Sequence, residues 1–105
     1  MTRVLYEPKR FHIRIEGHAG SAPKGEDLVC AGISALGFAM LLAAGEEDYN
    51  AEIQTDPDSG IMDVRCSPRW PYASDHCIVM MDTIAGGLEL MESQYPEYIK
   101  FERRE

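Results

Sequence analysis

The chain has 105 residues, enough for one domain with a modest hydrophobic core. Its composition, 45% hydrophobic and 27% charged, is that of a globular protein and argues against disorder. The formal net charge of −8 argues against a nucleic acid as a direct ligand, because an acidic chain gains nothing from counterion release. It favours a basic protein or peptide as partner instead.

Cysteine spacing and apolar runs indicate the compartment. Cys30, Cys66 and Cys77 are odd in number and contain no Cys-x-x-Cys pair, so they predict free thiols in a reducing environment. The N-terminal residues lack the apolar run of a signal peptide, and the run over residues 28–44 falls short of the roughly 20 residues of a membrane span. No ligand pairs have zinc-site spacing. We therefore expect a single cytoplasmic domain over residues 1–105, with no metal, no cofactor and no membrane contact.

The first predicted elements are two strands. A short strand over residues 3–6 leads into a turn at residues 8–10. Residues 11–17 alternate between apolar and polar side chains, which predicts a half-buried strand that ends at Gly17. His12 falls on the polar side of this strand, so it is predicted to be a surface residue.

A helix is predicted over residues 28–44. Asp27 is a good N-cap and Gly45 a natural residue to end the helix. Because the segment is apolar on nearly every side, we expect it to be the central and most buried element. Two short segments, residues 51–55 and 61–67, then flank a cluster of turn-forming residues and predict a hairpin, in which Met62, Val64 and Cys66 share one face.

A second, amphipathic helix is predicted to start at a cap formed by Ser74 or Asp75 and to end before Pro96. A last strand is predicted over residues 98–102. The order β-β-α-β-β-α-β indicates an α+β fold, in which a mixed sheet packs against two helices with the helix over residues 28–44 at its centre. The order of the strands within the sheet is not readable from the sequence.

The candidate chemistry lies around this first helix. Cys30 is the third residue of the predicted helix, where N–H groups, its own included, lack helical partners and favour a thiolate or an oxyanion. The negative charges of the nearby Glu26 and Asp27 side chains disfavour a thiolate at Cys30. His18 follows the preceding strand, and eleven residues separate it from Cys30, so the two side chains could meet as base and nucleophile.

The sequence spacing alone leaves a second interpretation open. A cysteine in an apolar helix is often a small core residue, and a histidine after a strand is often a surface residue. Cys66 and the adjacent His76 and Cys77 are expected to be structural, because neighbours on a helix point about 100° apart.

Two segments together resemble a known family. Residues 17–20 read Gly-His-Ala-Gly, residues 27–31 read Asp-Leu-Val-Cys-Ala, and residues 34–36 read Ser-Ala-Leu. This combination resembles the ribosomal-processing cysteine proteases called Prp, and the tail over residues 92–102 resembles the ending of that family.

The resemblance implies a catalytic pair with Cys30 as nucleophile and His18 as base. It further implies that Asp27 supports this pair by capping the helix and orienting His18, and that Ser34 of the matched motif supports it as well. The loop between the pair is expected to close over the substrate; its candidate residues are Gly17, Ala19, Gly20, Ser21 and Gly25.

The resemblance also implies a homodimer whose substrate is the short N-terminal extension of a large-subunit ribosomal protein. Related sequences occur in phage-derived gene clusters, so a phage-type protein with a similar extension is a second possible substrate. The alternative function is a non-catalytic adaptor on the same fold. Two features motivate that alternative, the acidic surface and Trp70. Trp70 lies between two prolines and could be either an exposed anchor for a partner or a lid on the core.

Overall fold

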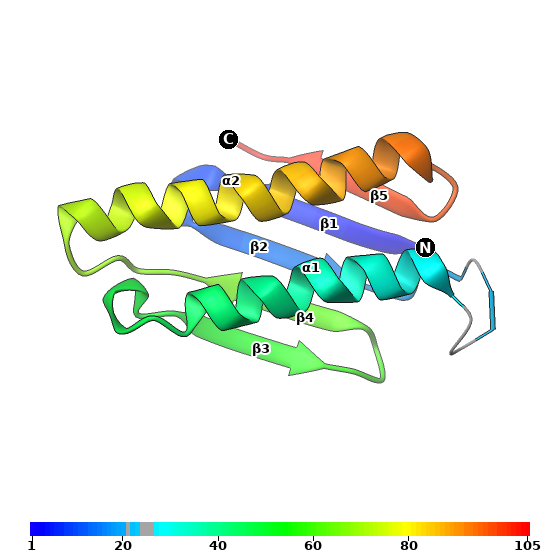
Figure 1. Ribbon diagram of the computed structural model, residues 1–105, viewed down its shortest axis with the longest axis horizontal. Coiled ribbons are helices and arrows are strands. Elements are labelled where there is room, and N and C mark those ends of the chain that lie inside the picture. The colour runs from blue at the N-terminus through cyan, green and yellow to red at the C-terminus, as the bar shows by residue number, and fades with distance from the viewer. Residues whose placement is uncertain (21, 24–26) are drawn as a thin grey trace.

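A computed structural model describes residues 1–20, 22–23 and 27–105 (Figure 1). Its helices and strands confirm the predicted order and the α+β class. The strands and helices are β1 (Thr2–Glu7), β2 (His12–Glu16), α1 (Leu28–Ala44), β3 (Glu52–Asp56), β4 (Ile61–Arg65), α2 (Pro71–Gln94) and β5 (Ile99–Arg103). Two short 3-10 helices, Pro8–Arg10 and Glu47–Tyr49, join β1 to β2 and α1 to β3.

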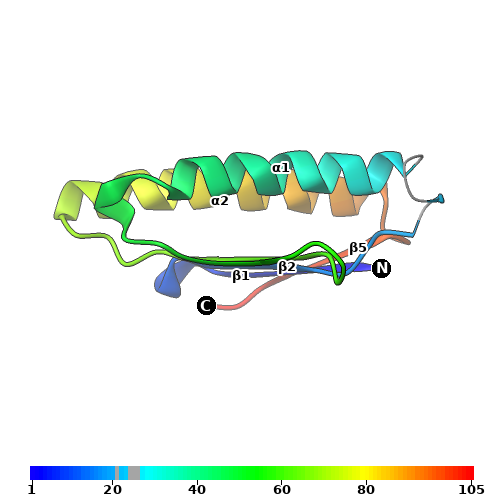
Figure 2. The ribbon, with the colours of Figure 1, turned by 90° about the horizontal axis from the view of Figure 1, so that it is seen from below.

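The five strands form one mixed sheet in the order β3-β4-β2-β1-β5. β5 runs parallel to β1, and the other neighbouring strands are antiparallel. α1 and α2 lie side by side in opposite directions on one face of the sheet, and in the described part of the chain no α-helix lies on the other face (Figures 1 and 2). β4 therefore lies beneath α1, β1 and β5 lie beneath α2, and the edge strand β3 is exposed along its length.

The core fills the layer between the sheet and the two helices. Tyr6, Ile13 and Val64 from the sheet meet Met40 of α1 and Met81 of α2, all at most 1% exposed. Burial of these large side chains supplies the main driving force for folding.

The expectation that the segment over residues 28–44 would be the most buried element is wrong, although its bounds as a helix are confirmed. Only one stripe of α1 is buried, and the opposite stripe leaves Leu28 and Leu42 more than 80% exposed and Phe38 61% exposed. The physical reason is the two-layer architecture. A helix on one face of an open sheet is covered by the sheet and by its neighbouring helix, and none of the residues described here covers its outer side.

α2 begins at Pro71, earlier than the predicted caps at Ser74 or Asp75. Trp70 is the N-cap residue and proline occupies the first helical position, where its missing N–H costs no hydrogen bond. Trp70 is 53% exposed, and its indole N–H donates to Asp48 Oδ1 at 3.2 Å, so it is not a lid on the core.

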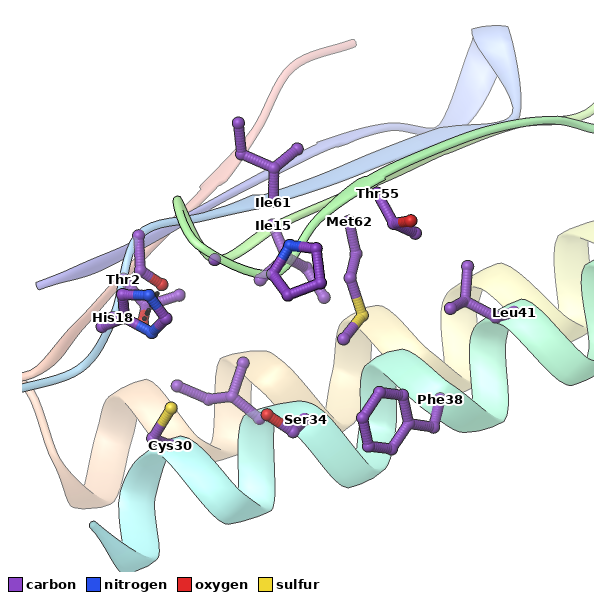
Figure 3. Close-up of a pocket in the computed structure, with 14 residues that line it drawn as sticks. Thr2, Ile15, His18, Cys30, Ser34, Phe38, Leu41, Thr55, Ile61 and Met62 are labelled. Atoms are coloured by element: carbon purple, nitrogen blue, oxygen red, sulfur yellow. Dashed lines mark hydrogen bonds between the residues drawn. The ribbon is translucent and has the colours of Figure 1, made fainter. Parts of the chain in front are cut away.

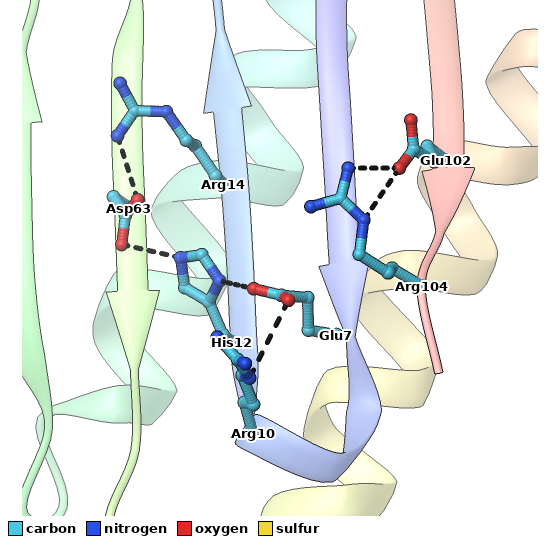
Figure 4. Close-up of polar contacts among 7 residues, drawn as sticks. All are labelled: Glu7, Arg10, His12, Arg14, Asp63, Glu102 and Arg104. Atoms are coloured by element: carbon cyan, nitrogen blue, oxygen red, sulfur yellow. Dashed lines mark hydrogen bonds and ion pairs between the residues drawn. The ribbon is translucent and has the colours of Figure 1, made fainter.

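His12 is buried, and its prediction as a surface residue is wrong. It is 5% exposed, with Nδ1 at 2.7 Å from Glu7 Oε1 and Nε2 at 2.9 Å from Asp63 Oδ1 (Figure 4). Asp63 also accepts from Arg14 Nη1 at 2.9 Å. The alternation assigned His12 correctly to the face of the sheet away from the helices, but carboxylates on the neighbouring strands cover it there.

This polar network changes the titration of both carboxylates. The hydrogen bond from His12 lowers the pKa of Glu7 below its ordinary value. Burial acts to raise the pKa of Asp63, but the hydrogen bonds from Arg14 and His12 outweigh it and leave that pKa lowered. Both carboxylates are therefore held in their charged form in the folded protein.

Candidate active site

His18 lies two residues after the end of β2, and the backbone of the intervening Gly17 is held from two sides. The Gly17 N–H donates to the Ser59 carbonyl at 3.2 Å, and the Gly17 carbonyl accepts from Thr2 Oγ1 at 3.0 Å. Gly17 has a φ of +91°, and a Cβ there would lie 2.7 Å from the Met1 carbonyl oxygen, so the position requires glycine. The strand end that carries His18 is thus fixed between the N-terminus and the β3–β4 turn.

Cys30 lies half-buried in the first turn of α1, and Asp27 is confirmed as the N-cap. Asp27 Oδ1 accepts from the Cys30 N–H at 2.8 Å, and the Asp27 carbonyl accepts from the Ala31 N–H at 3.0 Å. The expectation of an unpaired Cys30 N–H is therefore wrong, because the capping carboxylate already accepts its hydrogen bond. An oxyanion formed in this site needs other donors.

The imidazole of His18 contacts a residue that the sequence did not single out. His18 Nε2 lies 3.1 Å from the carbonyl oxygen of Asp58, in the turn between β3 and β4. The sequence cluster Asp-Pro-Asp-Ser-Gly at residues 56–60 predicted this turn, but not that it would lie against the end of β2. That juxtaposition depends on β2 pairing with β4, which local sequence patterns do not reveal.

The structure brings His18, Cys30 and Ser34 together in one groove between α1 and the β3–β4 hairpin. The groove consists of two adjoining cavities, one of about 300 Å³ and one of about 610 Å³. Both are lined by these three residues and by Pro57. The smaller cavity is apolar, and its lining includes Ile15, Ile33, Phe38, Leu41, Ile61 and Met62.

Figure 3 shows how the reactive side chains lie in this groove. The Cys30 sulfur points from α1 toward the wall of the groove that carries His18. Ser34 lies one helical turn after Cys30 on the same side of α1, because residues four apart share a helix face. The groove is open to solvent on the side of His18, which is exposed.

The other candidate loop residues differ in their surroundings. Ala19 is 3% exposed and belongs to the hydrophobic core. Gly20 has a φ of +74° and lines the larger cavity, and among the described residues nothing beyond its chain neighbours lies within 4 Å of the position of a Cβ. Ser21 and Gly25 lie outside the described residues.

The remaining thiols are structural. Cys66 and Cys77 are at most 3% exposed and hydrogen-bond to each other. That hydrogen bond and burial raise the pKa of Cys77 and keep it a neutral thiol. Within residues 1–20, 22–23 and 27–105, no three His, Cys, Asp or Glu side chains gather as metal ligands. In the same residues, no helix is long and apolar enough to span a bilayer.

Comparisons with solved structures find the same fold. A crystal structure of an essential ribosomal processing protease Prp from S. aureus, in complex with a covalently linked product peptide, matches with a TM-score of 0.85 and 25% identity, over 99% of this chain and 100% of that chain. The same protease in complex with a substrate peptide matches with a TM-score of 0.79 and 24% identity, over 99% of this chain and 100% of that chain. SMU.848 from Streptococcus mutans matches with a TM-score of 0.76 and 22% identity, over 97% of this chain and 90% of that chain. The last two matches establish the fold alone.

Comparison with curated proteins found no match. The model of the family described as cysteine protease Prp matches residues 2–100 of the chain. Since this match spans nearly the whole chain and includes both walls of the groove, the chain belongs to the cysteine protease Prp family and is a hydrolase.

Proposed function

We propose that this protein is an endopeptidase that removes a short N-terminal extension from a large-subunit ribosomal protein, or from a phage-type protein with a similar extension. The observation that carries the proposal is the groove in which the Cys30 thiol faces the wall that carries His18. The S. aureus relatives, which are ribosomal processing proteases, bind a product peptide covalently in one structure and a substrate peptide in another. The family implies a cytoplasmic location.

In this proposal Cys30 and His18 divide the chemistry of peptide hydrolysis. His18 takes the proton of the Cys30 thiol, and the thiolate attacks the scissile carbonyl carbon. His18 then donates that proton to the leaving amine, which leaves a thioester on Cys30. A water molecule, deprotonated by His18, hydrolyses the thioester and releases the second product. The apolar cavity accepts an apolar substrate side chain beside the scissile bond.

The supporting residues have separate roles. Asp27 fixes the start of α1 and thereby the position of Cys30, through its hydrogen bond to the Cys30 N–H. Ser34 lines both cavities and supplies a hydroxyl to the bound peptide backbone. The substrate loop includes Gly17, Ala19, Gly20, Ser21 and Gly25. The net charge of −8 attracts a basic ribosomal protein as substrate.

The test uses a peptide that spans the N-terminus of the ribosomal protein from the organism that encodes this chain. We expect wild type to cleave it at one bond and Cys30→Ala not to cleave it. Asp27→Ala, which removes the capping acceptor, and Ser34→Ala should each lower kcat/KM by about tenfold, while the exposed Val79→Thr on α2 should cleave normally. Peptide binding by both wild type and Cys30→Ala without cleavage by either would instead support the adaptor.

We also propose that two copies pair through the outer stripe of α1, as the homodimer of the family implies. Leu28, Phe38 and Leu42 are exposed along this stripe, where alanines separate them and permit close approach. A single chain rarely leaves such a row of large apolar side chains in water.

Analytical ultracentrifugation of wild type and Leu42→Glu tests the dimer. We expect a dimer for wild type and a monomer for the variant, because the glutamate would be buried unpaired in the interface. Ile53→Glu on the edge strand β3 is the matched control and should remain dimeric. A monomeric wild type at micromolar concentration would contradict the proposal.

A further inference from the structure

We propose that the main-chain carbonyl of Asp58 orients His18 as the third member of the catalytic group, so that Nδ1 of His18 is the atom that takes the Cys30 proton. This inference rests on the proposed proteolytic function. It assigns a positioning role to the β3–β4 turn, residues 56–60, and fixes which ring nitrogen acts.

The argument begins with the hydrogen bond between His18 Nε2 and the Asp58 carbonyl, at 3.1 Å. A carbonyl oxygen can only accept, so Nε2 must carry the proton in this contact. A neutral imidazole carries one proton, and Nδ1 therefore holds the free lone pair. Nδ1 is then the base: the S–H bond of Cys30 breaks, an Nδ1–H bond forms, and a thiolate and an imidazolium result.

The turn holds the Asp58 carbonyl in place through its own hydrogen bonds. Asp56 Oδ1 accepts from the N–H of Asp58 at 3.2 Å and from that of Ser59 at 3.4 Å. The Gly60 N–H donates to the Pro57 carbonyl at 3.3 Å. An aspartate that accepts from N–H groups two and three residues ahead is a common way to fix a turn.

The same turn also holds the backbone beside His18. The Ser59 carbonyl accepts from the Gly17 N–H at 3.2 Å. Gly60 has a φ of +66°, and a Cβ there would lie 2.8 Å from the Gly17 carbonyl oxygen and 3.2 Å from His18 Cε1. The turn thus contacts both the ring and the main chain of the base, and glycine at residue 60 permits this approach.

A carbonyl differs from a carboxylate in this role because it orients the ring without adding negative charge. Among the residues that the structure describes, the ionisable ones that line the larger cavity with His18 are Cys30, Asp27 and Asp58. Asp27, which the family resemblance gives the role of orienting His18, and the side chain of Asp58 are therefore the competitors for the orienting role, and the experiments must separate both from the Asp58 carbonyl.

The first measurement is independent of catalysis. We expect the imidazole ¹⁵N shifts of His18 in Cys30→Ala, recorded at a pH where the ring is neutral, to identify a protonated Nε2 and an unprotonated Nδ1. The His18→Gln spectrum assigns the signals. The opposite tautomer would overturn the inference, whatever the outcome of the cleavage assay. The predicted tautomer in a protein that cleaves no peptide would instead leave the contact intact and reject the proposed function.

The second measurement separates the turn from the carboxylate of Asp58. Asp56→Ala removes the acceptor that fixes the turn and should lower kcat by about tenfold with KM nearly unchanged. Asp56→Asn retains Oδ1 and should restore kcat to within about threefold of wild type. Asp58→Ala retains the carbonyl and should lower kcat less than Asp56→Ala does. A larger loss in Asp58→Ala, or full activity in Asp56→Ala, would overturn the inference.

Discussion

Replacing Cys30 with alanine or His18 with glutamine is expected to lower kcat for peptide cleavage on the order of 10³-fold or more, and the double variant is expected to be no less active than either single variant. The reason is that the two side chains act in one step. A thiol without a base and a base without a nucleophile are equally unable to form the thioester. Single-turnover cleavage of the ribosomal-protein peptide by the three variants measures this.

The control for this prediction is His76→Gln. His76 is exposed on α2 and packs edge-on against Tyr72, outside the groove, so its replacement should leave cleavage unchanged. Thermal unfolding of each variant verifies that it folds. If the loss in the double variant equalled the product of the two single losses, the side chains would act independently and the proposed pair would be wrong.

The sequence predicted the local features of this site correctly. Asp27 caps the helix that starts at Leu28, because the preference of aspartate for the N-cap depends only on the next three residues. The hairpin around residues 56–60 was predicted for the same reason, since turn-forming residues between two strand segments act locally.

The features that sequence could not predict depend on which strands pair. β2 lies between β1 and β4, and this places Glu7 and Asp63 beside His12 and the β3–β4 turn beside His18. The register places Glu7 opposite His12 in β1–β2, and Asp63 opposite Arg14 in β2–β4. Alternation assigns a residue to a face of the sheet, but burial on that face is decided by neighbouring strands. The exposed stripe of α1 has a similar origin, because apolar composition does not reveal whether a surface is covered within the chain or by a second chain.

The second large effect concerns stability and follows from the buried histidine. His12→Ala is expected to lower the free energy of unfolding at pH 7 by about 3 kcal/mol, because it leaves Glu7 and Asp63 in place without the donor between them. Asp63 keeps its hydrogen bond from Arg14, so the variant destabilises the charged carboxylate of Glu7 more than that of Asp63. Urea unfolding of wild type and variant measures the difference, and the exposed His76→Ala should change stability by less than about 0.5 kcal/mol.

The same variant has a characteristic pH dependence. The folded-state pKa values of Glu7 and Asp63 lie below their ordinary values, so their contribution to stability is complete above the unfolded-state pKa of about 4. It is lost as the pH falls through the folded-state values. Without His12 the folded-state pKa of Glu7 rises toward its ordinary value. Protonation of the two carboxylates in acid therefore lowers the free energy of unfolding less in the variant than in wild type. The stability gap between wild type and His12→Ala should therefore narrow between about pH 5 and about pH 3. A gap that stays constant or widens on acidification would show that the His12 hydrogen bonds do not stabilise the charged carboxylates.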